Sequence, residues 1–79
     1  MDKWYELWKI ESGNLVASYD SLASAMQNLS DTAAIRPPSW FEGKELIAEY
    51  ADESDPEVVA EGQALYSLAR SVSGSVATG

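Results

Sequence analysis

The second half of this sequence repeats the hydrophobic pattern of the first, and this repeat constrains the fold more than any other feature. Moving residues 15–29 forward by 43 positions aligns them with residues 58–72 without a gap. The strand-like part aligns Leu15 with Val58, Val16 with Val59 and Ala17 with Ala60, and the helix-like part aligns Leu22 with Leu65. A unit with one apolar sheet face and one apolar helix stripe buries neither alone, so two copies should pack together. Chance agreement is the alternative, because any two amphipathic helices share such a stripe.

Each copy begins with two strand-like segments. Residues 4–10 are rich in aromatic and β-branched residues, and a polar turn containing glycine connects them to a second strand over residues 15–19. In the second half, strands are expected over residues 44–50 and 58–60, joined by the polar turn 52–56.

An amphipathic helix is expected after each hairpin, over about residues 21–30 and 63–72. The apolar stripes recur at i, i+3, i+4 and i+7; they comprise Leu22, Ala25, Met26 and Leu29, and then Leu65, Leu68, Ala69 and Val72. Asp20 and Ser21 are residue types that cap helix N-termini. Pro37 and Pro38 prevent continuation, so residues 31–41 are expected to be a linker, with a short helical turn as an option at its start.

The predicted fold is α+β. It is a four-stranded antiparallel sheet with two helices on one face, built from a tandem strand-strand-helix repeat. A chain of 79 residues is too short for two independent cores, so we expect one domain over residues 1–72. The small, polar residues 73–79 are expected to form a flexible C-terminal tail.

Parts of the chain resemble known proteins. The residues concerned are Tyr5-Glu6-Leu7-Trp8, Ser12-Gly13-Asn14-Leu15, Tyr19-Asp20 and Ala60-Glu61-Gly62. Together they resemble a group of small single-domain bacterial proteins of uncharacterised function, over about residues 5–29 and 58–70. The linker at 37–40 has no match in that group. The resemblance implies a β-β-α-β-β-α fold and no activity.

The composition excludes several kinds of active site. The chain has neither histidine nor cysteine, which excludes a Ser-His-Asp triad, the usual zinc and iron sites, and disulfides. So short a chain hardly forms the groove that a carboxylate pair needs for glycoside hydrolysis. We therefore expect a non-enzymatic protein with no catalytic residue, no cofactor and no metal. The start of the chain lacks the pattern of a signal peptide and no apolar run is long enough to span a membrane, so we expect a cytoplasmic bacterial protein without membrane contact.

The charge of the chain restricts its partners. Net charge is −8, with thirteen acidic and five basic residues, which disfavours direct binding to nucleic acid and favours a basic protein partner. Eight carboxylates lie between residues 42 and 61, where Lys44 is the one cation. An acidic mimic of nucleic acid that occupies a basic protein groove is an alternative function. The plain alternative is that these charges only keep the protein soluble.

The aromatic residues indicate an interface. Trp4, Trp8 and Ile10 alternate with Tyr5 and Leu7, so one of these two sets must face away from the helices. We expect the exposed set to bind a partner, and we expect a homodimer that forms through the open face of the sheet or an edge strand. The alternative is that the linker carrying Trp40 and Phe41 covers the open face. The predicted interaction residues are Trp4, Trp8, Ile10, Trp40, Glu45, Glu49, Asp52 and Glu53.

Overall fold

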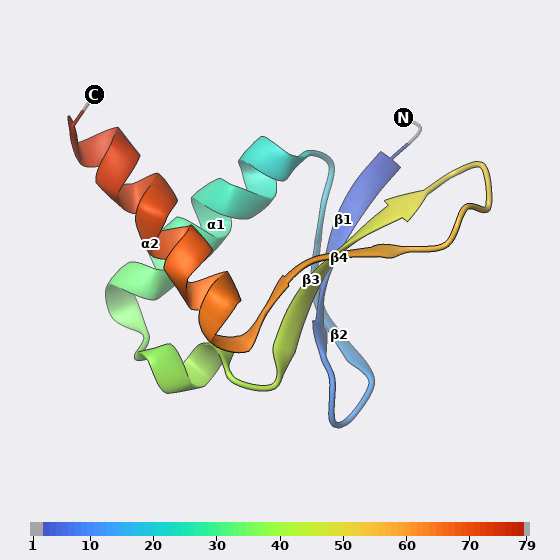
Figure 1. The fold of residues 1–79 in the computed structure, drawn as a ribbon, viewed down its shortest axis with the longest axis horizontal. Coiled ribbons are helices and arrows are strands. Elements are labelled where there is room, and N and C mark those ends of the chain that lie inside the picture. Colours follow the sequence, from blue (N-terminus) through green and yellow to red (C-terminus); the bar gives the residue numbers. More distant parts are fainter. Residues whose placement is uncertain (1–2, 79) are drawn as a thin grey trace.

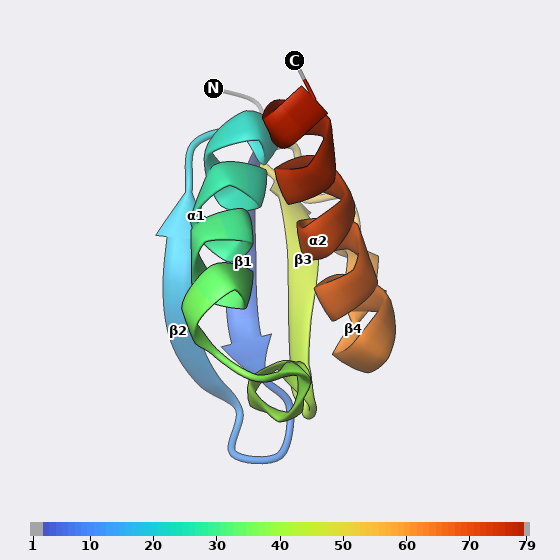
Figure 2. The same ribbon diagram turned by 90° about the vertical axis from the view of Figure 1, so that its left-hand side faces the viewer.

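The computed structural model describes residues 3–78 of the chain, and the side chains of residues 3–71. In chain order the elements are β1 (Lys3–Lys9), β2 (Asn14–Tyr19), α1 (Leu22–Ile35), the 3-10 helix η1 (Pro38–Phe41), β3 (Lys44–Tyr50), β4 (Glu57–Glu61) and α2 (Gly62–Thr78). The strands form one antiparallel sheet in the order β2-β1-β3-β4, and both helices cover the same face of it (Figures 1 and 2). The predicted α+β fold is confirmed.

The repeat is visible in the pairing of the strands. Leu7 and Leu46, at equivalent places in the two halves, oppose each other at the centre of the sheet. The equivalent hairpin pairs are Leu7 with Ala17 in the first half and Leu46 with Ala60 in the second. Directly beside these pairs each hairpin skips one residue, Val16 in β2 and Val59 in β4. The two halves therefore share a β-bulge at the same place in the repeat.

α1 begins where the sequence predicts and ends later. The N–H of Ser24 donates to Oγ of Ser21 at 3.1 Å, so Ser21 is the N-cap. The helix continues through Ile35, because the first obstacle is Pro37, which pushes the preceding residue out of helical geometry. Arg36 is accordingly extended, with φ −117° and ψ 146°.

α2 runs through Thr78, past the predicted end near residue 72. The stretch that we expected to be a tail is thus helical in its backbone as far as Thr78, and Gly79 lies outside the described residues. This stretch contains no proline. Within it, Gly74 lowers helix stability by only about 1 kcal/mol relative to alanine, which does not stop a helix.

The core lies between the sheet and the two helices. Its buried residues are Tyr5, Leu7, Ala25, Met26, Leu29, Ala33, Phe41, Leu46, Ala48, Leu65 and Ala69. Since Tyr5 and Leu7 point toward the helices, Trp4, Glu6 and Trp8 of β1 face away from them. Leu22 was expected in the buried stripe of α1, but it is 43% exposed, so that stripe begins at Ala25.

η1 contributes to the core, although its residues were expected to form only a linker. Phe41 is completely buried and makes edge-on contacts with the rings of Trp40 and Tyr66, at centroid distances of 5.0 and 5.2 Å. Nζ of Lys44 lies 4.1 Å from the centroid of the Trp40 ring and donates to the Trp40 carbonyl at 2.6 Å. These contacts hold η1 beside α2, on the helix side. The alternative in which the linker covers the open face is therefore wrong.

Candidate functional site

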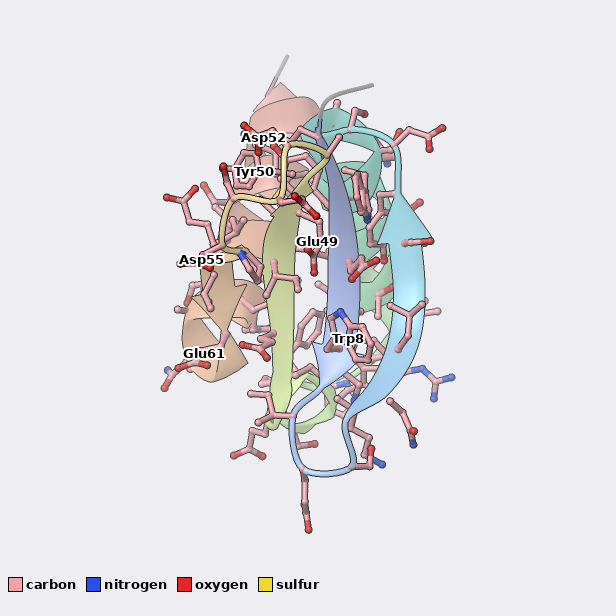
Figure 3. The ribbon with its side chains drawn as sticks, turned by 90° about the vertical axis from the view of Figure 1, so that its right-hand side faces the viewer. Trp8, Glu49, Tyr50, Asp52, Asp55 and Glu61 are labelled. Atoms are coloured by element: carbon pink, nitrogen blue, oxygen red, sulfur yellow. The ribbon has the colours of Figure 1, made fainter. Side chains whose placement is uncertain are left out.

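The candidate site is the face of the sheet that points away from the helices, which we call the open face (Figure 3). Side chains alternate along a strand, so residues whose neighbours point into the core lie here. The two central strands contribute three residues each: Trp4, Glu6 and Trp8 of β1, opposite Glu49, Ile47 and Glu45 of β3. All six are partly buried, and no segment that the structure describes covers them.

The two bulges add apolar residues to the open face. Each bulge shifts the alternation, so that Leu15 pairs with Trp8 and Val58 pairs with Ile47. Paired residues lie on the same side of a sheet. Trp8 and Ile47 lie diagonally across β1 and β3, so Leu15, Trp8, Ile47 and Val58 form one oblique strip that crosses all four strands, which we call the apolar band. Its two ends are well exposed, at 49% for Leu15 and 54% for Val58.

Carboxylates lie on both sides of the apolar band. Glu6 and Glu49 lie on one side, where Glu49 faces Trp4 across the strands. Glu45 and Glu61, which are paired between β3 and β4, lie on the other side. The approximate two-fold relation of the halves places Glu6 and Glu45 at equivalent positions. The open face therefore has an apolar centre with acidic residues on both flanks.

All five basic residues of the chain lie on the helix side. Lys3, Lys9 and Lys44 alternate with the outward-facing residues of β1 and β3, so they point away from the open face. Nζ of Lys3 lies 5.5 and 5.4 Å from the centroids of two tyrosine rings on the helix side of the sheet. Arg36 and Arg70 belong to the helical layer. Within residues 3–71, then, no cation neutralises the carboxylates of the open face.

Glu6 joins the two tryptophans. Nε1 of Trp4 donates to Oε2 of Glu6 at 3.0 Å, and Nε1 of Trp8 donates to Oε1 at 2.9 Å. The pKa of Glu49 is raised, first because its surroundings exclude water, and then by the negative charge of Glu6 and a hydrogen bond with it. A cation arriving beside this pair would interact with both carboxylates, and the neighbouring indole rings favour cations too.

The structure brings half of the predicted interaction residues together. Trp4, Trp8, Glu45 and Glu49 share the open face. Ile10 follows β1, with its N–H donating to the Gly43 carbonyl at 2.7 Å, and its side chain is 48% exposed. Trp40 lies on the helix side, away from the other two tryptophans. Asp52 and Glu53 lie in the turn after β3, and Figure 3 shows Asp52 at one end of the sheet.

Asp52 has a local structural role. Its Oδ1 accepts the N–H of Ser54 at 3.1 Å, which stabilises the turn between β3 and β4. Hydrogen bonds from the side chain and the backbone of Ser54 lower the pKa of the Asp52 carboxyl. Asp52 therefore has a part in the local structure of the turn.

Sequence reasoning missed five residues of the open face: Glu6, Leu15, Ile47, Val58 and Glu61. For Glu6 the signal was present, because strict alternation places it between Trp4 and Trp8. For Ile47 the signal is an apolar residue on the polar side of its strand, which is what an apolar patch on an open face requires. Leu15 and Val58 carried no such signal, because only a bulge moves them to this face.

Comparisons with protein-family models, with curated proteins and with solved structures give no match. The resemblance to small bacterial proteins therefore stays a prediction. No helix within residues 3–78 is long and apolar enough to cross a membrane. In the same part of the chain, no three acidic side chains gather in a way that suits a metal ion.

The part of the chain that the structure describes also has pockets away from the open face. One, beyond the end of β3, is lined by Lys3, Tyr50, Ala51 and Asp52. Another, between η1 and α2, is lined by Pro38, Ser39, Glu42, Gln63 and Tyr66. Neither has a buried polar side chain in its lining, so neither holds a group poised to recognise a small molecule. The open face is the stronger candidate.

Proposed function

We propose that this chain is a non-enzymatic protein-interaction module that binds a basic partner through its open face. The observation that carries the proposal is the apolar band flanked by Glu6, Glu45 and Glu49, on a face where residues 3–71 place no cation. Interfaces combine an apolar centre with a charged rim, and a rim of one sign selects partners of the opposite sign.

The charges on this face favour a different protein over a second copy. In a symmetric dimer the same patch meets itself, so the carboxylates of the two copies would lie opposite each other and repel. The predicted homodimer stays a hypothesis, for which the edge strands β2 and β4 are the better place. An acidic mimic of nucleic acid is supported less well than an interaction module, because mimicry needs charge alone and leaves the apolar band without a role.

Selection from a random peptide library displayed on phage tests the proposal. Peptides selected on the immobilised chain should be enriched in lysine or arginine together with large apolar residues. Binding should be lost with Ile47→Glu and largely kept with Ile35→Glu, which adds the same charge at a residue that is 79% exposed on α1. Ile47→Ser provides a milder variant, and circular dichroism checks that each variant is folded.

Two results would overturn the proposal. One is the absence of any enriched basic peptide, and the other is enrichment that Ile47→Glu and Ile47→Ser both leave intact. Peptides that contain cations without apolar residues, and whose binding disappears at high salt, would instead support the mimic of nucleic acid.

A further inference from the structure

The apolar band runs across the strands, and its length limits what can lie on it. From Leu15 on β2 to Val58 on β4 the band spans the full width of the sheet. Neighbouring strands are about 4.8 Å apart, and the band also steps about 6.6 Å along the strands between Trp8 and Ile47, so it is about 16 Å long. An α-helix covers that length with about eleven residues, or about three turns.

The flanking carboxylates favour a helix over an extended segment. Glu6 and Glu49 lie on one side of the band, and Glu45 and Glu61 lie on the other. An amphipathic helix presents an apolar stripe with side chains of both neighbouring faces beside it, so lysine or arginine on either edge of the stripe reaches a carboxylate. An extended segment directs alternate side chains toward and away from the surface, and so presents one row with no flanks.

We propose that the partner segment is a cationic amphipathic helix of about three turns. It lies across the strands with its apolar stripe on the apolar band and basic side chains on both sides. This inference rests on the proposed function of the same face and specifies the shape of the partner. The helix would add a third layer to the molecule, opposite the layer formed by α1 and α2 (Figure 1).

Two synthetic peptides of identical leucine and lysine composition and about 15 residues test the shape. In the first, leucines recur at i, i+3, i+4 and i+7 with lysines on both edges of the stripe; in the second, the two residue types alternate. Both are titrated into the full chain by calorimetry and by NMR, at concentrations where each peptide is monomeric. We expect the helical pattern to bind at least about tenfold more tightly, with amide shifts centred on the open face.

Variants of the chain locate the peptide. Ile47→Ser should weaken binding of the helical peptide about tenfold, whereas Leu22→Ser, at an exposed apolar residue of α1, should leave it unchanged. Glu6→Gln and Glu45→Gln, on opposite flanks, should each weaken it a few-fold. The matched control is Asp55→Asn, in the turn between β3 and β4.

The outcomes separate the two proposals. If both peptides bind the open face equally well, the helical partner is overturned and the basic partner remains. If the helical peptide binds but only one flank responds to neutralisation, the orientation across the strands is overturned. If neither peptide shifts the amides of the open face, the proposed function fails together with this inference.

Discussion

Glu6 lies between two tryptophans of the same strand and accepts an N–H from each, one with each carboxylate oxygen. A glutamine has only one oxygen acceptor, so Glu6→Gln must leave one of the two indole N–H groups without its partner. We expect one indole N–H resonance to move in the NMR spectrum and its exchange with water to become faster. Glu61→Gln, elsewhere on the same face, is the control. Two unchanged indole resonances in Glu6→Gln would contradict the bridging geometry.

Glu49 makes the stability of the fold depend on pH. Its pKa is raised above the ordinary 4.5, by loss of contact with water and by Glu6, which lies diagonally from it on β1. The folded chain thus holds this proton more tightly than the unfolded chain does, so the contribution of Glu49 to the free energy of unfolding falls as pH rises from the ordinary value through the raised one.

The variant Glu49→Gln is uncharged at every pH, so its free energy of unfolding does not fall as the pH rises through the raised pKa of Glu49. Above the raised pKa it should be more stable than the wild-type chain by about 0.5 kcal/mol or less, because solvent screens a charge near the surface. At a pH below the ordinary value the two proteins should be equally stable. Urea denaturation at a series of pH values measures the difference, and a difference that does not change with pH would contradict the assignment.

At the scale of elements, η1 is part of the core and not merely a connection. Phe41 is completely buried between Trp40 and Tyr66. Phe41→Ala should lower the free energy of unfolding by about 3–5 kcal/mol, because it removes a large buried ring and leaves a cavity. That decrease is a large part of the free energy of unfolding of a typical domain, which is roughly 5–15 kcal/mol. The midpoint of urea denaturation measures this decrease. Phe41→Leu keeps most of the side-chain volume and should lower the free energy of unfolding much less.

The elements that could be predicted are those with a regular pattern. The alternation of Leu46, Ala48 and Tyr50 fixed β3, and the helical stripes located α1 and α2, because burial of one face imposes a period on the sequence. The features that the sequence did not predict have no periodic hydrophobic pattern. The bulges at Val16 and Val59 shift a strand by one residue without a composition signal, and the 3-10 turn buries Phe41 through contacts that depend on the whole fold.

At the scale of the whole molecule, the sheet separates charge between its two faces. Every basic residue of the chain lies on the helix side, whereas the open face carries carboxylates around the apolar band. Half of the predicted interaction residues lie on that face, because the alternation of inward and outward side chains along β1 and β3 can be predicted from the sequence. Trp40, also a predicted interaction residue, lies on the helix side, and sequence alone does not say on which side of a sheet a linker packs.

This separation predicts how the chain behaves at high concentration. The apolar band favours association of two open faces, and the repulsion between their carboxylates opposes it. Neutralising Glu45, Glu49 and Glu61 together to glutamine should therefore strengthen self-association by about tenfold or more. Salt should strengthen self-association of the wild-type chain through the same face, because screening weakens the repulsion. Sedimentation velocity over a range of protein and salt concentrations measures both effects.

A control with the same change in net charge separates this effect from overall charge. Neutralising Asp52, Glu53 and Asp55 to their amides removes three charges from the turn between β3 and β4, outside the apolar band. If repulsion across the open face is what keeps two copies apart, this variant should sediment like the wild-type chain. Equal self-association of the two triple variants would mean that net charge alone governs association. A wild-type dimer whose open-face amides are protected from exchange would mean that this face meets its own copy despite the carboxylates.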